Sequence, residues 1–160
     1  VYNRRYLETV FAQKLEQCAA QGRKAAVALV SIDNGQKLRD TYGQPVMDQL
    51  HCFVGNQWKK HYDTPLHQVV CRLTGSIFVV GSVDTTGPQL AARMQELYEQ
   101  MPHECITTTG MMHRVQFTMS GAAAGLDEVE AKNWPALYEL CDARLRKVQA
   151  SGGDRIGCAE

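Results

Sequence analysis

Residues 25–32 read AAVALVSI, an almost continuous apolar run that ends at Asp33-Asn34-Gly35. The run is too short for a separate helix and is rich in branched side chains, so it predicts a β-strand buried on both faces. The three residues that follow favour a turn, which ends the strand. Such a strand belongs inside a sheet that other elements flank.

Apolar side chains recur at three- and four-residue spacing on both sides of this strand, which is typical of amphipathic helices. Gly22 supplies a stop for the first helix, and Pro45 supplies a start for a later one. The expected helices cover residues 4–21, 36–41, 45–59, 89–100 and 134–150.

Further short β-rich runs are joined by connections that contain glycine. Residues 68–73 and 77–81 flank Thr74-Gly75-Ser76, which predicts a β-hairpin, and residues 106–109 and 114–123 form a similar pair around Gly110. A final short strand is expected at residues 155–156. Because hairpins require antiparallel pairing, the expected class is α/β, with a central mixed sheet of about five strands flanked by helices.

The composition restricts the class of partner and the compartment. Seventeen basic and seventeen acidic side chains cancel, so no overall field attracts a nucleic acid. No apolar run approaches the roughly 20 residues that span a bilayer, and no signal peptide is visible, which predicts a cytoplasmic domain without membrane insertion. The chain starts at Val1 without a methionine, and we interpret residues 1–160 as one domain excised from a larger multidomain protein.

The six cysteines include no CxxC pair, and the five histidines have no metal-ligand spacing with a cysteine. We expect most of these cysteines to be buried and reduced, and we expect no metal and no cofactor. His51 and His67 lack acidic neighbours at catalytic spacing, so neither is expected to be a general base.

Five collinear pieces of the chain carry a resemblance to a known family. Residues 2–7 contain an Asn-Arg-Arg entry, and residues 31–34 with 40–43 resemble an Asp-x-Asp-x-Phe-Lys and Asn-Asp-x-x-Gly-His block. Residues 72–78, RLTGSIF, stand where Arg-x-Gly-Gly-Asp/Glu-Glu-Phe is found in GGDEF domains, the diguanylate cyclase family. The fourth piece is residues 118–120, and the fifth is residues 141–142 together with 152–156. The resemblance implies the nucleotidyl cyclase-like GGDEF fold.

In that family two domains of a dimer each present one GTP, and divalent metal held by carboxylates supports the condensation to cyclic di-GMP. The resemblance places Ser31 at the first metal-binding aspartate and Ser76 and Ile77 at the acidic positions of the signature. Hydroxyls are weak ligands for a hard cation, and isoleucine offers no oxygen. The signature as a whole reads Thr74, Gly75, Ser76, Ile77 and Phe78, which predicts a degenerate GGDEF domain that is not an enzyme.

Other family contacts are replaced as well. The guanine-contacting asparagine corresponds to Arg39, while its partner survives as Asp48, and Asp33 is a further residual candidate for the nucleotide site. For Asp48 a plain helix-start role is the alternative, and Arg39 is expected to be solvated. The phosphate-holding lysine and arginine correspond to Gln149 and Gly153. Residues 65–68 stand in place of the inhibitory Arg-x-x-Asp, so no inhibitory site is expected.

The first functional hypothesis is a catalytically inactive regulatory, interaction or dimerisation module in a cyclic di-GMP signalling protein. The Ser-Ile-Phe ending of the signature resembles the FimX-type GGDEF-EAL subgroup, which implies a role in type IV pilus twitching motility. The expected partners are neighbouring EAL, PAS or receiver domains, or a second copy. A GTP-binding sensory domain that activates an adjacent EAL phosphodiesterase domain is the alternative, and a working cyclase with relocated ligands is the third hypothesis.

Overall fold

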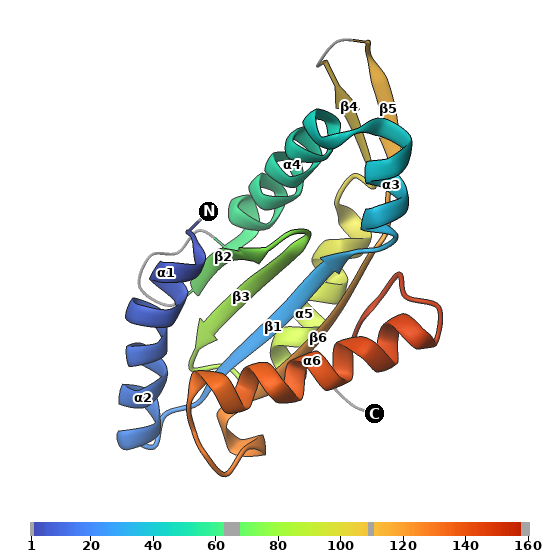
Figure 1. Ribbon diagram of the computed structural model, residues 1–160. Helices are drawn as coiled ribbons and strands as arrows, with labels where there is room; N and C mark the ends of the chain where they lie inside the picture. Colours follow the sequence, from blue (N-terminus) through green and yellow to red (C-terminus); the bar gives the residue numbers. More distant parts are fainter. Residues whose placement is uncertain (1, 63–67, 109–110, 158–160) are drawn as a thin grey trace.

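A computed structural model describes residues 2–62, 68–108 and 111–157. Its centre is a five-stranded sheet in the order β2-β3-β1-β6-β7, with helices on both faces (Figure 1). Strands β6 and β7 are parallel and the other neighbours are antiparallel, so the expected mixed α/β sheet is confirmed. The strands are β1 (Ala25–Ile32), β2 (Gln68–Thr74), β3 (Ile77–Val83), β6 (Met119–Gly125) and β7 (Ile156–Gly157).

Strand β1 lies in the middle of the sheet, and each of its eight residues is buried. Successive side chains point to opposite faces, which creates two separate cores. Ala28 and Val30 pack with the apolar sides of α4 (Gln44–Tyr62) and α5 (Gly87–Gln100). Val27 and Leu29 pack with the N-terminal helices and α6 (Trp134–Ala150). The run AAVALVSI is apolar throughout because both of its faces are covered.

The N-terminal helical segment consists of α1 (Arg4–Tyr6), a π-helical turn η1 (Leu7–Phe11) and α2 (Ala12–Ala20). Phe11 lies directly over Gly81 of β3, where a Cβ atom would overlap with the ring. Just before this segment, the Tyr2 carbonyl accepts a hydrogen bond from the backbone N–H of Arg72 at 2.8 Å, which attaches the entry of the domain to β2.

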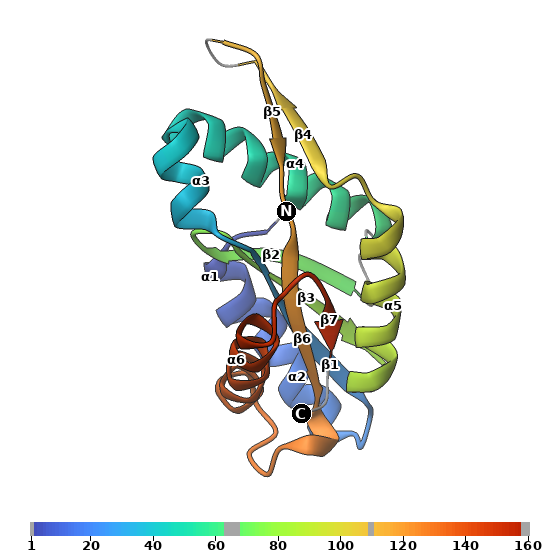
Figure 2. The same cartoon turned by 90° about the vertical axis from the view of Figure 1, so that its right-hand side faces the viewer.

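One expected strand is divided in the structure. The run 114–123 was predicted as a single strand, which is wrong: β5 (His113–Gln116) pairs with β4 (Glu104–Thr107) in a separate two-stranded sheet, and β6 starts at Met119. This small sheet projects beyond one end of the main sheet (Figure 2). The apolar pattern hides the break because Phe117 is itself buried, with its N–H bonded to the His103 carbonyl at 3.0 Å.

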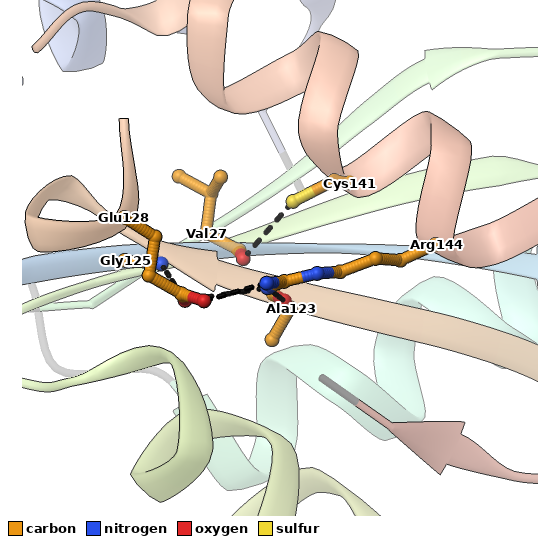
Figure 3. Close-up of polar contacts among 6 residues, drawn as sticks. All are labelled: Val27, Ala123, Gly125, Glu128, Cys141 and Arg144. Carbon is orange, nitrogen blue, oxygen red and sulfur yellow. Dashed lines mark hydrogen bonds and ion pairs between the residues drawn. The ribbon is translucent and has the colours of Figure 1, made fainter. Parts of the chain in front are cut away.

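An ion pair between the buried Arg144 and the more exposed Glu128 connects α6 with β6 and with the short 3₁₀ turn η2 (Leu126–Glu128) (Figure 3). Arg144 Nη2 lies 2.6 Å from Glu128 Oε2, and Arg144 Nη1 donates to the Ala123 carbonyl at 2.9 Å. Glu128 also accepts from the Gly125 N–H at 3.0 Å. The hydrogen bond from Arg144 leads the causes that lower the pKa of Glu128. The pair therefore fixes α6 against the sheet.

Two further expectations concern the cysteines and the membrane. Cys18, Cys71, Cys105 and Cys141 are buried free thiols and Cys52 is exposed, whereas Cys158 lies outside the described residues. The expectation that most cysteines are buried is thus confirmed for the described part of the chain. Within that part, the helices are too short or too polar to cross a membrane.

Candidate functional site

The site that the sequence predicted lies where β1, the β2–β3 turn and helix α3 (Gly35–Tyr42) meet. Ser31 is paired directly opposite Ile77 across β1 and β3. The Ile32 N–H donates to the Ser76 carbonyl at 3.2 Å, and a Cβ atom placed on Gly35 would lie 3.1 Å from Ser76 Oγ. The fold therefore brings these positions, which are far apart in the sequence, to one end of the sheet (Figure 1).

The family implies a divalent metal at this end, and the side chains present there do not fit one. Ser31 is buried and its hydroxyl donates to the neighbouring Ile32 carbonyl at 3.5 Å, while Ile77 contributes only carbon. Hard cations prefer several carboxylate or carbonyl oxygens. Among the described residues, no group of three or more His, Cys, Asp or Glu side chains is placed to hold a metal ion.

His51, which was not expected to be a general base, occupies the space beside Ser76. The ring of His51 on α4 is 2% exposed, and its Nε2 lies 2.8 Å from Ser76 Oγ. Its Nδ1 lies 2.9 Å from Arg72 Nη2, and Arg72 also donates to the Gly75 carbonyl through Nε at 3.2 Å and Nη2 at 3.1 Å. Burial, followed by the nearby Arg72 charge, lowers the pKa of His51 to about 4, so the ring is neutral at pH 7.

Asp33, one of the residual nucleotide-site candidates, is held by donors from three segments. Its carboxylate accepts from Thr118 Oγ1 at 2.7 Å, from Ser120 Oγ at 2.6 Å and from the Asp154 N–H at 3.1 Å. Gly153 has φ +70° and packs so closely that a Cβ atom would lie 2.6 Å from Ser120 Oγ. Asp33 thus joins the end of β1 to the start of β6 and to the loop before β7.

Arg39 and Asp48, the candidates for base recognition, belong to one row of polar side chains on α3 and α4. Arg39 donates to Gln36 Oε1 at 3.0 Å and to Gln44 Oε1 at 2.9 Å, and Gln44 donates to Asp48 Oδ1 at 2.8 Å. Arg39 was expected to be solvated rather than paired with Asp40 or Asp48; two side-chain amides hold its guanidinium at the surface. Asp48 is exposed, five residues into α4.

The remaining predicted positions belong to the β2–β3 hairpin, to α6 and to the segment before β2. Gly75, at φ +51°, makes the exposed turn of the signature, and Phe78 is buried in the core. Thr74 ends β2, opposite Ile77. Gln149 is exposed near the end of α6. The segment predicted to lack the inhibitory motif, residues 65–68, lies almost entirely outside the described residues.

A cavity of about 520 Å³ lies beside the site, under the base of the small sheet. Asp33 and Asn34 border it on one side, and Phe117 and Thr118 border it on another. The cavity has a mixed polar and apolar lining, and it is large enough for a small molecule. Its other lining residues are Leu38, His103, Glu104 and Gln116.

Residues 1–155 match the family model described as diguanylate cyclase, GGDEF domain. The chain belongs to the GGDEF family. The probable diguanylate cyclase DgcC of Escherichia coli K12 is 35% identical over 161 residues, which is 99% of this chain and 41% of that protein. The chain thus spans less than half the length of this relative. The family assignment and the role of the family in cyclic di-GMP signalling are confirmed.

Solved structures confirm the GGDEF fold. The GGDEF domain of YfiN (TpbB) from Pseudomonas aeruginosa superposes with a TM-score of 0.85 at 18% identity, covering 100% of this chain and 91% of that one. The GGDEF domain of DgcB from Caulobacter crescentus, solved with c-di-GMP, gives 0.85 at 17%, covering 98% and 90%. The FimX GGDEF domain from Pseudomonas aeruginosa gives 0.84 at 18%, covering 98% and 94%.

The expectation that this GGDEF domain is not an enzyme is wrong. The family is one of enzymes, and the relative at 35% identity is a probable diguanylate cyclase. The expectation was drawn from replacements at single positions, namely the metal positions Ser31, Ser76 and Ile77 together with Thr74, Arg39, Gln149 and Gly153, whereas the match to an enzyme family extends over residues 1–155. The missing carboxylates show which metal ligands are replaced, and they are not a measurement of catalytic turnover.

Proposed function

We propose that this GGDEF domain binds GTP at the end of the sheet and acts as a regulatory module in a cyclic di-GMP signalling protein. The observation that carries the proposal is the convergence of the Ser76 hydroxyl and the first turn of α3 at the end of β1. Hydroxyl groups and the N–H groups at a helix N-terminus are donors suited to phosphate oxygens. The row from Arg39 to Asp48 offers a cation and a carboxylate for the base.

Binding is tested by titration calorimetry of the purified domain with GTP, with ATP as the comparison. We expect micromolar affinity for GTP and weaker binding of ATP, because the Asp48 carboxylate can accept from the N1 and N2 hydrogens of guanine. Asp48→Asn should weaken GTP by about tenfold, the effect of one charge-assisted hydrogen bond.

The chain offers a matched control. Asp40 accepts from Gln36 at 2.9 Å, in the same four-residue arrangement by which Asp48 accepts from Gln44 at 2.8 Å, and both carboxylates are exposed. Asp40→Asn should leave GTP affinity unchanged. Equal losses in both variants would show a general charge effect, and no heat with GTP in the wild-type domain would refute the proposal.

A second candidate function, cyclic di-GMP synthesis, is favoured by the 35% identity to a probable diguanylate cyclase. The test is mass-spectrometric detection of cyclic di-GMP after incubation with GTP and Mg²⁺ or Mn²⁺. Product that disappears in Asp48→Asn would establish synthesis by this site. Absence of product at concentrations that saturate GTP binding would leave the regulatory role as the function.

We further propose that the nucleotide state is passed to a neighbouring domain, with an EAL phosphodiesterase domain as first candidate and PAS or receiver domains or a second copy as others. A role in type IV pilus twitching rests on the Ser76-Ile77-Phe78 ending of the signature alone. The test is phosphodiesterase activity of the complete protein with and without GTP, together with twitching of a strain that carries Asp48→Asn. Unchanged activity and motility would refute this extension.

A further inference from the structure

His51 is a buried polar side chain that none of the roles described above uses. It comes from α4, and its two ring nitrogens contact Arg72 of β2 and Ser76 of the β2–β3 turn, at 2.9 Å and 2.8 Å. Because both ring nitrogens of this buried histidine have a partner, the contacts determine which nitrogen carries the proton.

The identity of the donors follows from the chemistry of Arg72. A guanidinium carries only donors and does not lose its proton in proteins, so the Nδ1 atom of His51 must accept from Arg72 Nη2. Since the ring is neutral, its one proton is on Nε2, and Nε2–H donates to Ser76 Oγ. The two further bonds from Arg72 to the Gly75 carbonyl fix the guanidinium, so the opposite tautomer would face it with a second donor.

We propose that His51 is a positioning residue that prepares the Ser76 hydroxyl as a donor to a phosphate oxygen of the bound nucleotide. The lone pair of Ser76 Oγ already accepts from His51, so the hydroxyl hydrogen is directed to another acceptor. Ser76 Oγ faces Gly35 at the start of α3. A Cβ atom placed on Gly35 would lie 3.1 Å from this oxygen. An anion at this helix start accepts a hydrogen bond from the Ser76 hydroxyl group, while a cation there is disfavoured by the same donor.

This inference rests on the proposed function for its ligand, but the proton arrangement can be measured in the free protein. Nitrogen-15 NMR of the imidazole at pH 7 distinguishes the two neutral tautomers, and the signals are assigned by their loss in His51→Gln. We expect a protonated Nε2 and an unprotonated Nδ1. A protonated Nδ1, or a charged ring at pH 7, would overturn the positioning role whatever the protein binds.

The binding test compares two substitutions of different chemistry. His51→Gln keeps an acceptor for Arg72 and a donor for Ser76, whereas His51→Leu keeps similar volume and removes both. We expect GTP affinity to fall about tenfold in His51→Leu and by less than about threefold in His51→Gln, the difference expected for one lost hydrogen bond. A purely structural role would instead make the two variants equal in affinity once both are folded.

Ser76→Ala supplies a variant that does not depend on the folding of His51→Leu. It should lose about tenfold in GTP affinity, and the double variant His51→Leu/Ser76→Ala should lose no more, because both changes remove the same donor. Ser82→Ala, near the far end of β3, is the matched control. Additive losses in the double variant would overturn the inference, and failure of the wild-type domain to bind GTP would overturn the proposed function together with the ligand assigned here.

Discussion

The buried His51 ring should make the stability of the domain depend on pH in a specific window. The pKa of His51 is about 4 in the folded chain, against 6.5 in an unfolded one. Between these values the unfolded chain binds one more proton than the folded chain, so acidification favours unfolding. The stability that depends on a neutral His51 ring is fully present above pH 6.5 and is lost as the pH falls toward 4.

The magnitude follows from 1.36 kcal/mol for each pH unit across that window, which gives a loss of about 3 kcal/mol. This value applies to a ring that is 2% exposed, so solvent screens it little. Desolvation is the largest cause, Arg72 and Arg39 add to it, and Asp48 opposes it.

Urea unfolding at several pH values between 7 and 4 measures this loss, and His51→Gln isolates it. The glutamine does not titrate, so the difference in unfolding free energy between the two proteins should move by about 3 kcal/mol in favour of the variant as pH falls. Carboxyl groups such as Glu128, whose pKa is also lowered, titrate equally in both proteins and cancel. Parallel stability curves would refute the assignment of a low pKa to His51.

Two further predictions, each with a pair of variants, test the packing on the other face of the sheet. Glu128→Gln should lower the free energy of unfolding by about 2–3 kcal/mol, because it leaves the guanidinium of Arg144, whose side chain is 10% exposed, without its carboxylate. Arg146→Ala is the control: it breaks a pair with Asp142 in which the arginine side chain is 78% exposed, and it should change the free energy of unfolding by less than about 0.5 kcal/mol. Similar losses in the two would refute the burial argument. Gly81→Ala should lower the free energy of unfolding by about 1–3 kcal/mol, because the new methyl group overlaps with the Phe11 ring. Phe11→Leu should relieve part of that loss in a double-mutant cycle. Strictly additive losses would contradict the contact.

The parts of the fold that the sequence predicted are those with a strong local pattern. The run at residues 25–32 and the helix at 134–150 have the predicted bounds, because burial on both faces and a regular apolar stripe leave few alternatives. The split at Phe117 was missed because a buried aromatic residue continues the alternation while the backbone leaves one sheet for another.

The site was predictable only in part, for a related reason. The motif resemblance placed Ser31 and Ser76 at one site, and the β1–β3 register brings their strands together there. The contacts of His51 join residues 21 and 25 positions apart, and no local pattern specifies such contacts. A histidine within the apolar stripe of α4, beside Leu50 and Val54, was the available signal.

The arrangement around Ser76 predicts how an attempt to build a metal site would behave. In Ser31→Asp/Ser76→Asp/Ile77→Glu, the new carboxylate at position 76 would accept a hydrogen bond from the Nε2–H group of His51. The negative charge beside the ring would raise the pKa of His51. The carboxylate would then pair with an imidazolium and lose affinity for Mg²⁺. Adding His51→Leu should therefore increase Mg²⁺ affinity about tenfold over the triple variant, as measured by calorimetry. The uncharged control is Ser31→Asn/Ser76→Asn/Ile77→Gln, which places amides at the same three positions. Equal Mg²⁺ affinity with and without His51 would show that the histidine does not govern the chemistry of this turn.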